Sequence, residues 1–270
     1  MLRILKIEWL KIKNYKAFWW VVGITAITYM ATSFMALAFY KQVSTSSKIP
    51  PNVAKAWLGN PFSFEEIWHT TAYISSFFII IPSLIVIMLI TNEYSFKTNR
   101  QNIIDGWSRN QFLTGKLLDV TVISLMITVL YVLTCIAIGS TNSSPTEMGN
   151  GKIHFIGYFV LQTFSQLSIA LFIGLVVRKS FIALGIFIFS SVILEPSITW
   201  FFSSHNFVIG NFLPFEISDK MIPPPAFMAK AGPEMYQAAM DATSAHFFYT
   251  AIFTLALWLI CFKLNAKSDI

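Results

Sequence analysis

Long apolar runs separated by shorter polar segments dominate this chain. Six of these runs cover residues 18–40, 71–90, 117–138, 156–177, 181–202 and 246–262. A helix needs about 20 apolar residues to cross the roughly 30 Å of bilayer hydrocarbon. Lipid offers no partner to an unpaired backbone group, so helices are the favoured spanning element. The pattern therefore predicts an all-α integral membrane protein, with six transmembrane helices in a single domain over residues 1–270.

Composition agrees with this prediction. The chain is 55% hydrophobic and 12% charged, whereas about a quarter of the residues of a soluble domain are charged. The two cysteines, Cys135 and Cys261, fall at different depths of different spans, so we expect no disulfide.

Residues 1–17 combine basic side chains with an apolar helical sector formed by Leu2, Leu5, Trp9 and Ile12. This arrangement predicts an N-terminal interfacial helix, and a plain positive anchor for the first span is the alternative. A cleaved signal peptide is disfavoured, because the run 18–40 exceeds the 7–15 apolar residues typical of such a segment.

Basic residues set the expected orientation. With a cytoplasmic N-terminus, 13 of the 19 Lys and Arg residues lie inside and 6 outside, which follows the positive-inside rule. We therefore expect a multi-pass protein of the cell inner (cytoplasmic) membrane with both termini cytoplasmic. The net charge of +6 then reflects topology, and we expect no nucleic-acid partner.

A long polar insert, residues 93–116, lies between the second and third runs. It carries both basic and apolar side chains: Lys97, Arg100, Arg109 and Lys116 together with Phe96, Ile103, Ile104, Trp107 and Phe112. A flexible linker has no need of these apolar residues, so the insert indicates a docking surface for another protein. The alternative is a loop whose basic residues only fix topology.

The segment before the last run, residues 203–245, is also unusual. Its stretch 207–215 is too short to span and rather apolar for water, which predicts an outer segment that partly dips into the membrane. Pro233 and Glu234 predict the start of a separate short helix.

Motifs for covalent chemistry are missing from the sequence. Gly115-Lys116 is followed by Leu117, so no phosphate-binding loop is complete. The four histidines are scattered near the outer side, and we expect neither a metal site nor catalytic residues.

A few polar residues inside spans are candidates for packing or for function. Glu195, followed by Pro196, is the one ionisable group that we expect deep in a span. It either stabilises helix packing or belongs to a transport path. Gln162 and Gln166 share a helix face and suit interhelical hydrogen bonds, although a substrate groove is the alternative. Pro82 and Ser83 predict a kink in the second span.

Several of these features together resemble the permease subunits of ABC-2 type exporters. They are the basic leading helix, Glu93, the run 100–104, Trp107-Ser108-Arg109 and Gly115-Lys116, together with the outer segment and Glu195-Pro196. The resemblance covers essentially the whole chain. Gly106-Trp107 is a departure, because many relatives carry a proline near the Ser-Arg pair.

The resemblance implies that the insert forms a cytoplasmic coupling helix between helices 2 and 3, seated in a cleft of a separate ABC ATP-binding subunit. Its expected docking residues are Arg100, Asn102, Ile103, Ile104, Asp105, Trp107 and Arg109. ATP and Mg would bind to that partner, leaving no cofactor in this chain. A second permease copy or a homologous permease is implied as well, with Ser76, Ser83 and Glu195 as candidate pathway residues.

We therefore expect the permease subunit of an ATP-driven exporter for an apolar or amphiphilic substrate, since the spans carry few polar groups. One alternative is a non-transporting membrane anchor or assembly subunit for an ATPase. Another is a secondary transporter.

Overall fold

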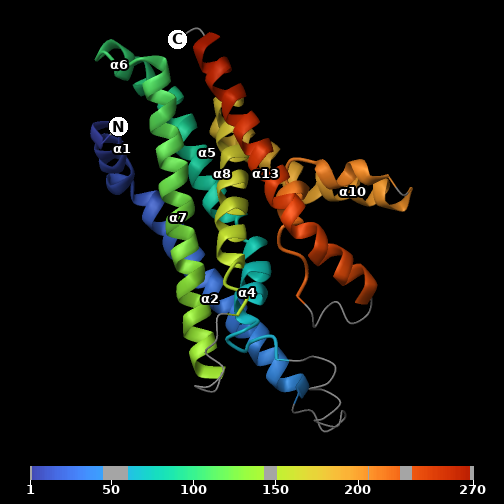
Figure 1. The fold of residues 1–270 in the computed structure, drawn as a ribbon. Coiled ribbons are helices and arrows are strands. Elements are labelled where there is room, and N and C mark those ends of the chain that lie inside the picture. The colour runs from blue at the N-terminus through green and yellow to red at the C-terminus, as the bar shows by residue number, and fades with distance from the viewer. Residues whose placement is uncertain (1, 45–59, 143–150, 206, 226–232, 268–270) are drawn as a thin grey trace.

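The computed structural model describes residues 2–44, 60–142, 151–205, 207–225 and 233–267. Long helices running roughly side by side make up the molecule (Figure 1), and the described residues contain no strand. The helices are α1 (Leu2–Asn14), α2 (Lys16–Ser44), α4 (Ile67–Ser76), α5 (Ile80–Ser95), α6 (Thr98–Ile104), α7 (Arg109–Asn142), α8 (Phe155–Val177), α9 (Ser180–Ile188), α10 (Glu195–Ser204), α11 (Glu216–Asp219) and α13 (Pro233–Lys267). A π-helical segment, η2 (Phe189–Leu194), joins α9 to α10, and a 3-10 helix, η3 (Val208–Phe212), follows α10.

Five helical segments are long and apolar enough to cross a membrane: Lys16–Ser44, Arg109–Asn142, Phe155–Val177, Ser180–Ser204 and Tyr236–Ala266. The helices α4 and α5 pass the same test as a pair, bent by 50°. The predicted membrane-spanning class is thus confirmed, and the second predicted run corresponds to the bent pair. N- and C-terminal ends lie at one end of the bundle beside α6 (Figure 1), which we call the α6 end.

The bend between α4 and α5 lies just before the predicted kink at Pro82. Proline has no N–H for the carbonyl of Phe78 and its ring crowds that carbonyl. Phe78, Ile79 and Ile81 instead donate to carbonyls three residues earlier, which is the tighter 3-10 pattern. The break therefore falls at residues 77–79, with Pro82 in the first turn of α5.

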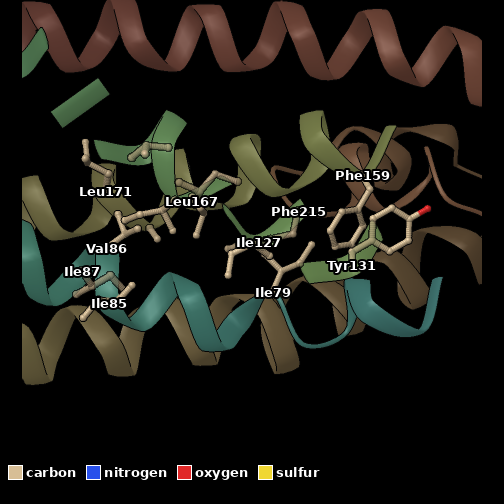
Figure 2. Packing of buried hydrophobic residues seen from close by; sticks show 14 of the residues in the cluster. Ile79, Ile85, Val86, Ile87, Ile127, Tyr131, Phe159, Leu167, Leu171 and Phe215 are labelled. Carbon is tan, nitrogen blue, oxygen red and sulfur yellow. The ribbon is translucent and has the colours of Figure 1, made fainter. Parts of the chain in front are cut away.

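Helix α8 is the centre of the packing. It contacts α4, α5, α7, α9 and α13, and its apolar side chains meet those of α5 and α7 in the core (Figure 2). Phe159 of α8 and Tyr131 of α7 lie side by side there, with ring centroids 4.5 Å apart.

The last helix differs from the prediction. The sequence predicted a short helix from Pro233 that is separate from a span at 246–262. This prediction is wrong, because α13 runs unbroken for 35 residues. The physical reason is the absence of Gly and Pro between Glu234 and Lys267, so nothing interrupts the backbone hydrogen bonds.

Candidate functional site

The polar insert is folded into a short helix with a defined turn on each side. We call residues 96–108 the elbow; it comprises α6 and these two turns. Lys97 enters α6 with a left-handed φ of 56°, and Gly106 leaves it with φ of 94°. Gly106 N–H donates to Ile103 O and Trp107 N–H to Asn102 O, both at 3.0 Å. These two bonds form a Schellman motif, for which glycine is the favoured residue, and this explains why the chain needs no proline at the turn.

The next helix begins with a reciprocal cap. Ser108 N–H donates to Gln111 Oε1 at 2.9 Å, and Gln111 N–H donates to Ser108 Oγ at 3.1 Å. This capping box satisfies two backbone donors that the first turn of α7 would otherwise leave free. The elbow is therefore a fixed helix–turn–helix unit with α7 as its continuation.

Buried charges connect the elbow to the N-terminal helix. Lys116 of α7 donates to Glu8 at 2.5 Å, to Glu93 at 2.7 Å and to Asp119 at 3.0 Å. Lys11 contacts Glu8 and Glu93 at 2.8 and 3.3 Å. We call these five residues the ionic cluster; it joins α1, α5 and α7 beside the elbow.

The ionic cluster keeps Glu8 ionised. Burial by itself would raise the pKa of the Glu8 carboxyl, but the ammonium groups of Lys116 and Lys11 outweigh it and lower the pKa to about 2. Glu8 is only 1% exposed, so removal of its partners would leave a buried charge without compensation.

Two further contacts attach neighbouring elements to the elbow. Arg109 donates to the carbonyl of Ala266 at 2.7 Å, and Asn265 donates to the carbonyl of Arg109 at 2.8 Å, which joins α7 to the C-terminal part of α13. The ammonium of Lys11 lies 5.7 Å from the centroid of the Trp107 ring. The elbow thus contacts α1 through Trp107, and the first residue of α7, directly after the elbow, contacts α13.

The predicted docking residues divide into two groups. Arg100, Ile104 and Asp105 are exposed, and Ile104 reaches 84% exposure. Asn102, Ile103, Trp107 and Arg109 are half-buried, and the last two interact with α1 and α13 within the chain. An exposed apolar side chain between two charged ones is the composition expected of a protein-binding surface.

Of the three predicted pathway residues, one lines a cavity of about 720 Å³ that lies away from the α6 end. Ser76 lines this cavity, which we call the polar cavity. Glu195 is not part of the lining but bonds to it: Glu195 Oε2 accepts the backbone N–H groups of the lining residues Phe215 and Glu216 at 2.8 and 3.2 Å. Ser83 is fully buried and donates to the carbonyl of Ile79, so it lies outside the cavity lining.

The predicted interhelical role of Gln162 and Gln166 has a specific partner. Both amides donate to Oδ1 of Asp219 in α11, at 2.8 and 2.7 Å. These bonds and those to Glu195 fix the short helix α11 against α8 and α10.

Sequence reasoning missed three carboxylates. Asp119, near the start of the predicted run 117–138, is buried and pairs with Lys116. Its spacing of three residues from Lys116 is a signal that the sequence offered. Glu8 offered the same spacing to Lys11, but its second partner, Lys116, is 108 residues away, and the partners of Asp219 are more than 50 residues away.

Comparison with known families identifies the chain. A search of curated proteins found no match. The sequence profile described as "ABC-2 family transporter protein" matches residues 4–194, from α1 to the end of η2. The match includes the ionic cluster and the elbow, and it ends before α11 and α13. With most of its length matched and its helices built to span a membrane, the chain belongs to the ABC-2 family of transporter proteins, as a membrane-spanning permease.

Proposed function

We propose that this chain is the permease subunit of an ATP-driven exporter, and that a separate ABC ATP-binding subunit docks on the elbow. The observation that carries the proposal is the construction of the elbow. Its exposed Arg100, Ile104 and Asp105 stand on a unit fixed by two caps at the turn into α7, and the ionic cluster lies beside it.

The proposed topology has six spans with both termini in the cytoplasm. The bent pair α4 and α5 counts as the second span, and the two termini at one end of the bundle support an even number of crossings (Figure 1). The excess of basic residues toward the α6 end supports a cytoplasmic location for the elbow in the cell inner membrane.

The proposed mechanism follows from the contacts of the elbow. A push on α6 acts on α5 and α7 through short turns, on α1 through the ionic cluster and on α13 through Arg109. Because α5 continues into α4 at the polar cavity, movement of α5 alters that cavity. Closure of two ATPase subunits would thereby change the access of an apolar or amphiphilic substrate to the cavity. A second permease, identical or homologous, completes the proposed transporter.

Charge reversal on the elbow tests the docking step. Ile104→Asp and the pair Arg100→Glu with Asp105→Lys change exposed side chains, so the permease should fold normally. We expect each variant to lose co-purification of the ATP-binding subunit and ATP-driven transport. Glu234→Lys, an exposed charge change near the start of α13, is the matched control.

Retained co-purification and transport in both elbow variants would refute the docking proposal. A different result is that the complex forms normally while no solute tested in reconstituted vesicles changes its ATPase activity. That result would favour the alternative of an anchor or assembly subunit.

A further inference from the structure

Asp219 is a carboxylate without a cationic partner among the described residues. Its acceptor Oδ1 takes hydrogen bonds from Gln162 and Gln166, and its side chain is open to the polar cavity. Lys220, the adjacent cation, bonds instead to Glu216 at 3.3 Å. The ionised form of Asp219 therefore has no compensating cation in the cavity, and a bound cation would satisfy it.

The rest of the polar cavity combines apolar walls with an unused polar group. Tyr73, Ile80, Phe187 and Val192 supply apolar surface. His246 lines the cavity from α13, is only 6% exposed, and its Nδ1 lacks a partner among the described residues. A buried, unpaired ring nitrogen beside an unpaired carboxylate points to a ligand that carries hydrogen-bond donors.

A second cavity of about 400 Å³ lies against the first and has an entirely apolar wall. We call it the apolar cavity; α2 and α4 form most of it, with Thr32, Ala36 and Phe39 on the α2 side. Tyr73 and Phe77 line both cavities, and their rings pack edge to face at 5.1 Å. These two aromatic side chains, at the end of α4 and at the break after it, are common to the walls of both spaces.

We propose that the two cavities form one binding site for an amphiphile with a primary ammonium head and a hydrocarbon chain. Asp219 and Glu216 receive the head in the polar cavity, and the chain fills the apolar cavity. This inference rests on the proposed transport function, for which it names the substrate class. The polar part of the site is built by residues beyond the 4–194 family match: Glu216, Asp219 and His246.

The titration of Asp219 predicts how binding responds to pH. The side chain of Asp219 is accessible from the cavity but is surrounded by protein. The resulting desolvation, opposed by the Gln162 amide and reinforced by Glu216 and Glu195, raises the pKa of Asp219 to about 7. The groups that face it are Glu216, Lys220, Glu195, Tyr73 and His246. An alkylamine, with a pKa near that of lysine at about 10, stays charged from pH 5 to 8. Affinity should therefore rise with pH through 7 as Asp219 ionises.

The test measures binding of radiolabelled dodecylamine to the full chain in phosphatidylcholine nanodiscs, with empty nanodiscs subtracted. Dodecyl sulfate and dodecanol serve as competitors of the same chain length. We expect saturable binding of the radiolabel. Unlabelled dodecylamine should displace it at low concentration, whereas dodecyl sulfate and dodecanol should not. Asp219→Asn should weaken it by about tenfold, as loss of one charge-assisted hydrogen bond predicts, and remove the pH dependence. Asp241→Asn, an exposed carboxylate on α13, is the matched control.

The apolar cavity is tested by chain length and by filling. Hexylamine should bind more weakly than dodecylamine. The Ala36→Phe substitution should weaken the binding of dodecylamine and leave the binding of hexylamine unchanged. The chain-length comparison uses the unaltered protein, so it decides the point even if the variant fails to fold. Equal binding of hexylamine and dodecylamine, equal competition by dodecyl sulfate, or unchanged binding in Asp219→Asn would each overturn the inference.

Two further experiments distinguish a lipid from a free amine as the ligand, and this inference from the docking proposal. Competition by phosphatidylethanolamine in the nanodiscs would assign the ammonium head to a lipid, and its absence would assign it to a free amine. Arg100→Glu with Asp105→Lys should bind dodecylamine normally, since the elbow lies away from the polar cavity. If the unaltered protein fails to bind amines but still transports another solute with ATP, this inference is overturned and the proposed transport function stands.

Discussion

One ammonium group holds three carboxylates together at the α6 end. Lys116 is 2% exposed and contacts Glu8, Glu93 and Asp119, each from within 3.0 Å. Burial of a single charge in such a place is costly, and mutual pairing offsets that cost only while all partners are present. The side chain of Lys116 is therefore a structural requirement for the junction of α1, α5 and α7.

Lys116→Met should destabilise the protein by about 3–5 kcal/mol, because it leaves the carboxylates buried with only the half-exposed Lys11 as a counter-charge. The measurement is Tm in detergent at neutral pH. Lys116→Arg, which keeps the positive charge, should recover part of the loss, and Lys179→Met at an exposed position should have little effect. An unchanged Tm for Lys116→Met would show that the ionic cluster contributes nothing to stability.

At the scale of elements, the contact between α5 and α8 depends on the absence of one side chain. A Cβ added at Gly174 would lie 2.5 Å from Cγ2 of Ile90. Isoleucine is β-branched, so its χ1 in a helix is nearly fixed and Cγ2 cannot turn away. Glycine at this position lets the two helices approach closely, as small residues do in membrane proteins.

Gly174→Ala should cost about 1–3 kcal/mol through overpacking. Combining it with Ile90→Leu, which moves the branch away from Cβ, should recover much of that loss. The difference between the double variant and the sum of the single variants gives the coupling energy. Gly157→Ala is a control on the same helix, since a Cβ there meets nothing within 4 Å. Equal stability of Gly174→Ala and Gly157→Ala would contradict the close approach.

The helices of this chain were predictable from local pattern, and several of their ends and bends were not. Apolar runs located the spans, and Pro82 marked a bend because proline acts on the carbonyl four residues earlier. The π-helical segment before Pro196 was not predicted. Helix α13 was divided wrongly because its first three turns are only moderately apolar, which suits a helix outside lipid as well as a loop.

The sites were predictable only where the partners lie close in sequence. The elbow was recognisable from its mixed composition and from its place between two spans. The carboxylates Glu8 and Asp219 have partners supplied by other helices, and no local pattern carries that information. The charged group of Lys116 could be read as a topology signal, although its burial depends on α1 folding back against α7.

At the scale of the whole molecule, Ser180–Ser204 is the least covered of the five candidate spanning segments. Only 17% of its apolar window is buried, against 61% for α8, and α10 points away from the other helices (Figure 1). Trp200 and Phe201 are 74% and 53% exposed on α10. We propose that this face meets the second permease of the transporter.

Trp200→Cys should form a disulfide-linked dimer in native membranes after mild oxidation, if the second permease is an identical copy. The two native cysteines are buried and should not react. Ile252→Cys, an exposed position on α13, is the control that should stay monomeric. If cysteines introduced one at a time along α10 all leave the protein monomeric after oxidation, then lipid or a different chain covers this face.

The order of synthesis matters for a protein joined in this way. Glu8 and Lys116 are 108 positions apart, so at about 5–20 residues per second the ribosome needs roughly 5–20 s to deliver the lysine after the glutamate. During that interval Glu8 lacks its partner in α7. Docking of α1 in its final position must therefore await synthesis of α7.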